Sequence, residues 1–303
     1  MENKRPIQRR DFLKSATAAS VLAGAATLVV RADEPAKLAE GTQNQSSAGG
    51  SMVGQEAVDC LANLLRGMEN VRSLDVFEAI LTPKPKKRSN EKGSYYDFNS
   101  KRPIAVSADE EKIISKALEL RDASHMPFWD AVLLVCHEHE SVPHGLLQAA
   151  QHHAGIASTA KGQTLTRQQV LGGALKQMCQ NKGRSKWVGM TSAVVLDDGS
   201  TAHIPMLNFR CRISPLNRKL VGEVTRQLLP GGAIILEAGT VYQAYGKSTI
   251  PQKSFAPLLG QALLFGNVVN HRYIAHQLID GKCTVRISAG STKKSVPVCV
   301  DVV

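Results

Sequence analysis

The hydrophobic pattern of this 303-residue chain changes abruptly near Trp187. Before that point apolar side chains recur every three or four residues, as on one face of a helix. After it, short apolar runs alternate with turn residues, as in antiparallel strands. Helices and strands segregated in this way indicate an α+β fold. We expect a helical domain over residues 54–183, and over residues 184–303 a mainly antiparallel sheet with helices on one face.

Local signals place the elements within these two regions. Two capping boxes, Ser107 with Glu110 and Thr166 with Gln169, mark helix starts, because each pair can satisfy free backbone N–H groups. Past Trp187, a hairpin turn at residues 197–199 leads into a return strand over residues 201–213, which Pro205 interrupts or leaves at a sheet edge. Helices are expected to begin at Pro127, Ser214 and Pro251.

Composition excludes several protein classes and leaves the choice of partner open. Hydrophobic residues make up 43% and charged residues 21%, which excludes wholesale disorder, collagen and a polytopic membrane protein. The six cysteines lack the C-x-x-C pairs of structural zinc sites. Residues 184–303 carry 14 Lys and Arg against 6 Asp and Glu. This basic domain suits a nucleic acid or another polyanion, although a solvated surface that maintains solubility has the same composition.

The N-terminus carries a short basic motif. Arg9 and Arg10 are followed, after one residue, by Phe12 and Leu13. This order resembles the R-R-x-F-L-K motif of twin-arginine (Tat) signals, with Gln8 where Ser or Thr is usual. The resemblance implies recognition by the Tat translocase during export. The expected location is then periplasmic or extracellular.

An apolar run over residues 15–30 follows the motif. It has about 16 residues, fewer than the ~20 that span a bilayer, so a removable signal fits better than a permanent helix. We expect a signal peptide over residues 1–32, a flexible linker over residues 33–53 and no stable membrane span in the mature chain. A soluble amphipathic N-terminal helix is the alternative.

Histidines gather between residues 137 and 153. His139, Glu140 and His144 could hold a transition-metal ion if the backbone turns near Pro143, because imidazole and carboxylate are common ligands of such ions. The alternative is that these polar residues only end one helix and begin the next. The sequence assigns no cofactor.

Three stretches of the C-terminal region, at residues 205–210, 239–246 and 268–278, resemble primase–polymerase-like (archaeo-eukaryotic primase) domains. In that family two aspartate sites chelate the divalent ions that activate a nucleoside triphosphate, and a histidine meets its phosphates. Here Asn208 and Asn270 stand at the acid positions and Gln243 at the histidine position. The resemblance therefore implies a degenerate site without nucleotidyl transfer, and no catalytic residue is assigned.

An anion-binding groove could persist beside the degenerate site. The resemblance suggests four residues for it, and Tyr242 and Tyr245 are available for stacking. The groove residues are Arg210, Arg272, His276 and Arg286. Alternatively, Arg272 and His276 only tether their helix and the tyrosines pack the sheet.

Three functions remain open. The first is an exported, non-catalytic primase-like protein that binds a nucleic acid, a nucleotide or another anionic ligand. The second is an exported metal-binding protein or metalloenzyme that uses the histidine cluster. The third is an interaction protein of the cell envelope. The degenerate-site hypothesis requires Asn208, Gln243 and Asn270 to meet at one cleft.

Overall fold

The computed structural model describes residues 51–80, 94–96, 103–105, 107–124, 126–137, 143–151, 161–183, 186–290 and 294–303. The chain divides into two units, residues 1–49 and 50–303, and every described residue belongs to the second. The twin-arginine residues lie outside the described part, as do His139 and Glu140. The fold is α+β with antiparallel sheets, as predicted. Among the described helices, none is both long and apolar enough to cross a membrane.

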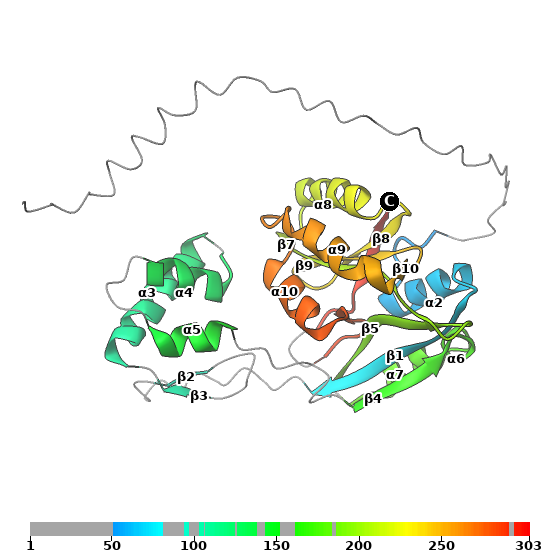
Figure 1. The fold of residues 1–303 in the computed structure, drawn as a ribbon, viewed down its shortest axis with the longest axis horizontal. Helices are drawn as coiled ribbons and strands as arrows, with labels where there is room; N and C mark the ends of the chain where they lie inside the picture. Colours follow the sequence, from blue (N-terminus) through cyan, green and yellow to red (C-terminus); the bar gives the residue numbers. More distant parts are fainter. Residues whose placement is uncertain are drawn as a thin grey trace, which may run out of the picture. The chain divides into compact units, whose positions relative to one another are not determined.

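The first sheet is organised around strand β5. Its strands run in the order β10-β6-β5-β1-β4, β11 also pairs with β5, and all of these pairs are antiparallel. The bounds are β1 Val71–Ile80, β4 Lys161–Thr166, β5 Lys186–Leu196, β6 Thr201–His203, β10 Ile250–Pro251 and β11 Thr284–Arg286. Figure 1 shows β1, β4 and β5 lying side by side.

Strands β1 and β4 correct the expectation that residues 54–183 are helical throughout. In β1, Leu74 and Val76 belong to the main core, whereas Phe77 and Ala79 are buried in a separate cluster, so this strand buries side chains on both faces. This strand pairs with β5, which follows it by more than 100 residues. A pairing over that distance leaves no turn signal beside the strand, so the local sequence pattern does not reveal it. The domain boundaries themselves stay a prediction.

The second sheet has the order β12-β8-β9-β7, again antiparallel. Its strands are β7 Met206–Arg212, β8 Ala233–Glu237, β9 Val241–Gly246 and β12 Val298–Val302. The predicted return strand over residues 201–213 is divided at Pro205, since β6 lies in the first sheet and β7 in the second. Proline has no N–H to donate to a ladder, so the chain changes sheets there at low cost.

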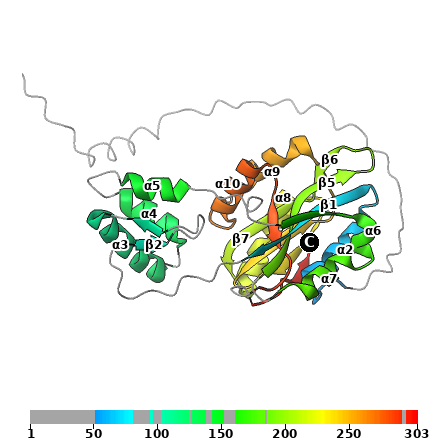
Figure 2. The ribbon, with the colours of Figure 1, turned by 90° about the horizontal axis from the view of Figure 1, so that it is seen from below.

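Helices pack against both sheets (Figures 1 and 2). Helices α2, α6 and α7 contact one another beside the first sheet, and α8 contacts the second. Helix α10 contacts β7 and α9. The bounds are α2 Ala57–Gly67, α6 Arg167–Leu171, α7 Ala174–Asn181, α8 Pro215–Leu228, α9 Gln252–Leu263 and α10 His271–Asp280.

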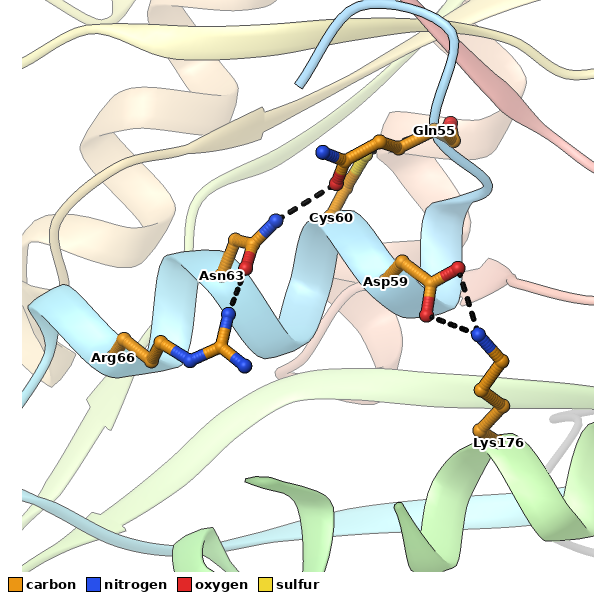
Figure 3. A network of polar contacts seen from close by, with 6 residues as sticks. All are labelled: Gln55, Asp59, Cys60, Asn63, Arg66 and Lys176. Atoms are coloured by element: carbon orange, nitrogen blue, oxygen red, sulfur yellow. Dashed lines mark hydrogen bonds and ion pairs between the residues drawn. The ribbon is translucent and has the colours of Figure 1, made fainter. Parts of the chain in front are cut away.

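Polar contacts add to the packing of α2. Lys176 of α7 reaches across to Asp59 of α2, with Nζ 2.9 Å from Oδ1 (Figure 3). On the same helix, the Asn63 amide donates to Gln55 Oε1 at 2.7 Å, and Asn63 also accepts from Arg66. The segment before α2 bonds to the C-terminal strand through Gly54 N–H and the Cys299 carbonyl, 2.8 Å apart. The first and last described segments are therefore joined.

A group of three helices lies in the chain between β1 and β4. We call residues 107–151 the helical insert, whose helices are α3 Ala108–Ser124, α4 Phe128–His137 and α5 His144–Gln151. The predicted capping box at α3 is confirmed, because Ser107 and Glu110 each accept the backbone N–H of the other. The insert has its own apolar core, which includes Ile113, Trp129 and Leu146. Before it, the short strands β2 Ser94–Tyr96 and β3 Pro103–Ala105 pair with each other.

Candidate functional site

The structure brings Asn208, Gln243 and Asn270 together. Asn208 on β7 is directly opposite Gln243 on β9, so the two side chains lie on the same face of the second sheet. The backbone N–H of Asn270 donates to the Asn208 carbonyl at 2.8 Å. The Asn270 side chain also donates to Asn208, with 3.3 Å between Nδ2 and Oδ1. Residues separated by up to 62 positions thus form one cluster, which we call the amide cluster.

The oxygens of the amide cluster are already engaged. Gln243 Oε1 accepts from the Tyr245 hydroxyl at 3.0 Å. Asn270 caps α10, because its Oδ1 accepts from the Tyr273 N–H at 3.1 Å. A hard divalent cation prefers carboxylates, whose charge supplies most of the attraction. Neutral amides that accept internal hydrogen bonds do not fit the divalent-ion site that the family resemblance implies.

The described residues provide no other metal site. Among them, no group of three or more His, Cys, Asp or Glu side chains has an arrangement that could hold an ion. His144 is exposed at the start of α5. Its proposed partners His139 and Glu140 lie outside the described residues, so the histidine-cluster hypothesis stays a prediction.

A cavity of about 290 Å³ adjoins the amide cluster and includes Asn270 in its wall. Of the described residues that line it, none is acidic, and the wall contains two guanidinium groups and two imidazoles. The residues that matter below are Trp129, Arg210, His271, Arg272 and His276. Such a wall favours an anionic ligand. A second cavity, of about 260 Å³ on the first sheet, has mixed charge because Asp75, Asp280 and Lys282 line it.

The cavity beside the amide cluster is lined by three of the predicted groove residues, Arg210, Arg272 and His276. Arg210 is on β7, and its backbone N–H donates to the Val268 carbonyl at 2.9 Å. The Arg272 guanidinium donates to the Ala150 carbonyl of the helical insert. This contact supports a tethering role for Arg272, and its place in the cavity wall also allows a role in binding.

Arg286 lies elsewhere. It is only 9% exposed and is not among the described residues of the cavity wall. Its guanidinium donates to the carbonyls of Ser288, Ser295 and Ala238, the last at 3.4 Å. Burial lowers the pKa of Arg286. These contacts make Arg286 a link between β11 and two loops rather than part of the groove.

Both tyrosines offered for stacking are also buried. Tyr242 donates to the Ser214 carbonyl at 2.9 Å and accepts the Ser214 N–H at 3.0 Å, which holds the start of α8. Tyr245 bonds to Gln243, and burial raises its pKa well above the usual value. Neither ring has an exposed face. The expectation that they stack on a ligand is wrong, because both rings are packed in the interior.

Sequence reasoning missed Asp130 and His271. Asp130 Oδ1 is 3.2 Å from His271 Nε2, and its Oδ2 is 3.8 Å from Arg210 Nη1. His271 follows Asn270 directly and lies in the primase-like stretch at residues 268–278, so the sequence could have indicated that it is near the site. Asp130 had no such signal, because it precedes its partners by 80 and 141 residues and resembles any acidic residue in the first turn of a helix.

The second sheet carries the amide cluster, and the basic cavity lies beside that cluster. Together they define an α+β domain with a polar site between β7 and α10. Residues 166–298 match the family model described as archaeo-eukaryotic primase 1D-like. The match covers less than half of the chain and contains Asn208, Gln243 and Asn270. The chain therefore contains a primase-like domain. No curated protein and no solved structure matches the chain.

Proposed function

We propose that this chain is an exported, non-catalytic primase-like protein that binds an anionic ligand of the nucleotide or nucleic-acid class. The observation that carries the proposal is the basic cavity, in which Arg210, Arg272 and His276 stand beside the amide cluster. The family match supports the nucleotide class of ligand. The twin-arginine motif at Arg9 and Arg10 supports export.

The absence of catalysis is inferred from charge. Phosphoryl transfer needs metal ions that neutralise charge on the phosphates, and carboxylates concentrate those ions. Asn208, Gln243 and Asn270 are neutral, and Arg210, two residues after Asn208, adds positive charge where a second carboxylate would attract a cation. This set should repel a free divalent ion and attract a phosphate.

Binding to ATP and to a single-stranded oligothymidylate tests the proposal. The Arg210→Ala variant should bind either probe about tenfold more weakly, since a hydrogen bond to a charged group contributes roughly 1.5–3 kcal/mol. Affinity should also fall as salt is raised. The matched control is Arg226→Ala, which removes an exposed arginine that pairs with Glu223 on α8.

The outcomes separate cleanly. Failure of the unsubstituted chain to bind either probe at low salt contradicts the proposal. Equal weakening by Arg226→Ala contradicts the assignment of the cavity, because the effect would then follow net charge alone. Incorporation of nucleotides in the presence of magnesium or manganese contradicts the non-catalytic assignment.

A further inference from the structure

A carboxylate of the chain itself pairs with two basic residues of the cavity wall. Asp130 lies in the first turn of α4, and its side chain is only 16% exposed. One oxygen is 3.2 Å from His271 Nε2 and the other is 3.8 Å from Arg210 Nη1. Its two oxygens therefore approach two different basic groups, as two oxygens of a phosphate would.

Polar contacts connect the helical insert that carries Asp130 to β7 and α10. The apolar cluster of the insert shares no residue with the main core. The contacts described between the two parts include the pairs of Asp130 with Arg210 and His271, and the bond from Arg272 to the Ala150 carbonyl. An anionic ligand can replace such polar contacts with equivalent ones, whereas separating an apolar interface would expose core side chains.

We propose that Asp130 is a built-in occupant of the anion site, and that a phosphate group of the ligand displaces it from Arg210 and His271. This inference rests on the proposed function and names the group that is recognised. The cavity, at about 290 Å³, is slightly smaller than the ~300 Å³ at which the range for small-molecule sites begins. The ligand is thus a phosphate ester of about mononucleotide size, or the phosphorylated end of a longer strand.

Inorganic pyrophosphate is the probe, measured by calorimetric titration of the full chain. The Asp130→Asn variant keeps the shape of the side chain and removes the competing charge. It should bind pyrophosphate about tenfold more tightly, if one charge-assisted contact is relieved. The matched control is Asp122→Asn, because Asp122 is an exposed carboxylate of the same insert that pairs only locally, with Arg121.

The results distinguish this inference from the proposed function. Tighter binding by Asp130→Asn alone supports the inference. Equal affinity in all three proteins overturns the inference and leaves the anion site in place. Weaker binding by Asp130→Asn also overturns it, because Asp130 would then assist the ligand. Failure of every protein to bind pyrophosphate overturns this inference, whereas the proposed function fails only if ATP and the oligothymidylate do not bind either.

A second readout needs no substitution. Trp129 lines the cavity, whereas the other tryptophan of the chain, Trp187, packs edge-on against Phe77 in a separate cluster. If pyrophosphate displaces Asp130 and the insert moves away from the cavity, acrylamide should quench tryptophan fluorescence more strongly, because the part of Trp129 that lines the cavity becomes more accessible. Unchanged or reduced quenching at saturating pyrophosphate would overturn the displacement.

Discussion

Asn208 and Asn270 hold β7 against the start of α10. The Asn270 backbone N–H and side-chain amide both donate to Asn208, while the Asn270 oxygen caps the helix. An amide can donate and accept at the same time, which a carboxylate cannot do. The two asparagines therefore stabilise a junction where paired acids would repel each other unless a cation lay between them.

Replacing both residues tests this reading. The Asn208→Asp, Asn270→Asp double variant places two carboxylates at atoms now 3.3 Å apart, so its Tm should fall by several degrees. Millimolar manganese should recover most of that loss, because the cation binds the folded state. The single Asn208→Asp variant, whose carboxylate still accepts from the Asn270 amide, should respond little to manganese. Identical manganese responses would show that the two positions do not share a site.

Among the elements, β5 is the central strand of the first sheet, because β1, β6 and β11 all pair with it. Gly189 lies where three of these strands meet. A Cβ at this position would be 2.5 Å from Phe77 Cζ and 2.8 Å from the Val285 carbonyl oxygen. Both distances are shorter than real Cβ contacts, so the strands can approach this closely only if residue 189 has no side chain.

The Gly189→Ala variant should consequently lose about 1–3 kcal/mol of unfolding free energy, the usual cost of overpacking. Gly260→Ala is the matched control, because a Cβ there meets nothing within 4 Å in the helix α9. That change should be neutral or stabilise by about 0.5–1 kcal/mol, since alanine loses less backbone entropy than glycine in a helix. Urea unfolding of both variants measures the difference. Equal stabilities would mean that β1 and β11 yield easily around β5.

At the scale of the whole molecule, His203 links the first sheet to α9 through buried polar contacts. His203 Nδ1 is 2.9 Å from Ser192 Oγ, Nε2 is 2.5 Å from Gln252 Oε1, and the ring stacks on Phe255. Ser192 Oγ also accepts the Cys283 N–H at 2.8 Å. Burial is the main cause that lowers the pKa of His203 below 6.5, while the bond to Gln252 opposes it. Burial in the folded protein therefore disfavours the protonated form of this imidazole.

This burial predicts a pH dependence of stability. As pH falls below about 6.5, the unfolded chain protonates this histidine more readily than the folded chain does, so the unfolded state binds more protons. The unfolding free energy should decline as pH falls from 6.5 toward the lower pKa of the folded state, and should change little from this source above 6.5. Urea unfolding between pH 5 and 8 checks the slope. His203→Gln should flatten it, whereas His144→Gln, at an exposed position, should not.

The sequence by itself determined the α+β class and those features that depend on neighbours along the chain. The capping box at Thr166 and Gln169, the turn at residues 197–199 and the start of α8 after Ser214 are all present, because each requires only contacts within a few residues. The family resemblance also singles out Asn208, Gln243 and Asn270, which the structure brings together.

Only the tertiary structure decided which of these residues form a site. In the folded chain β1 pairs with β5, Tyr245 and Arg286 are buried, and Asp130 lies beside Arg210. Burial and long-range pairing depend on the closure of the whole chain, and a charge near its partner in space looks like any other charge in the sequence. The physical reason is that hydrogen-bond periodicity is local, whereas packing and electrostatic contact act through space.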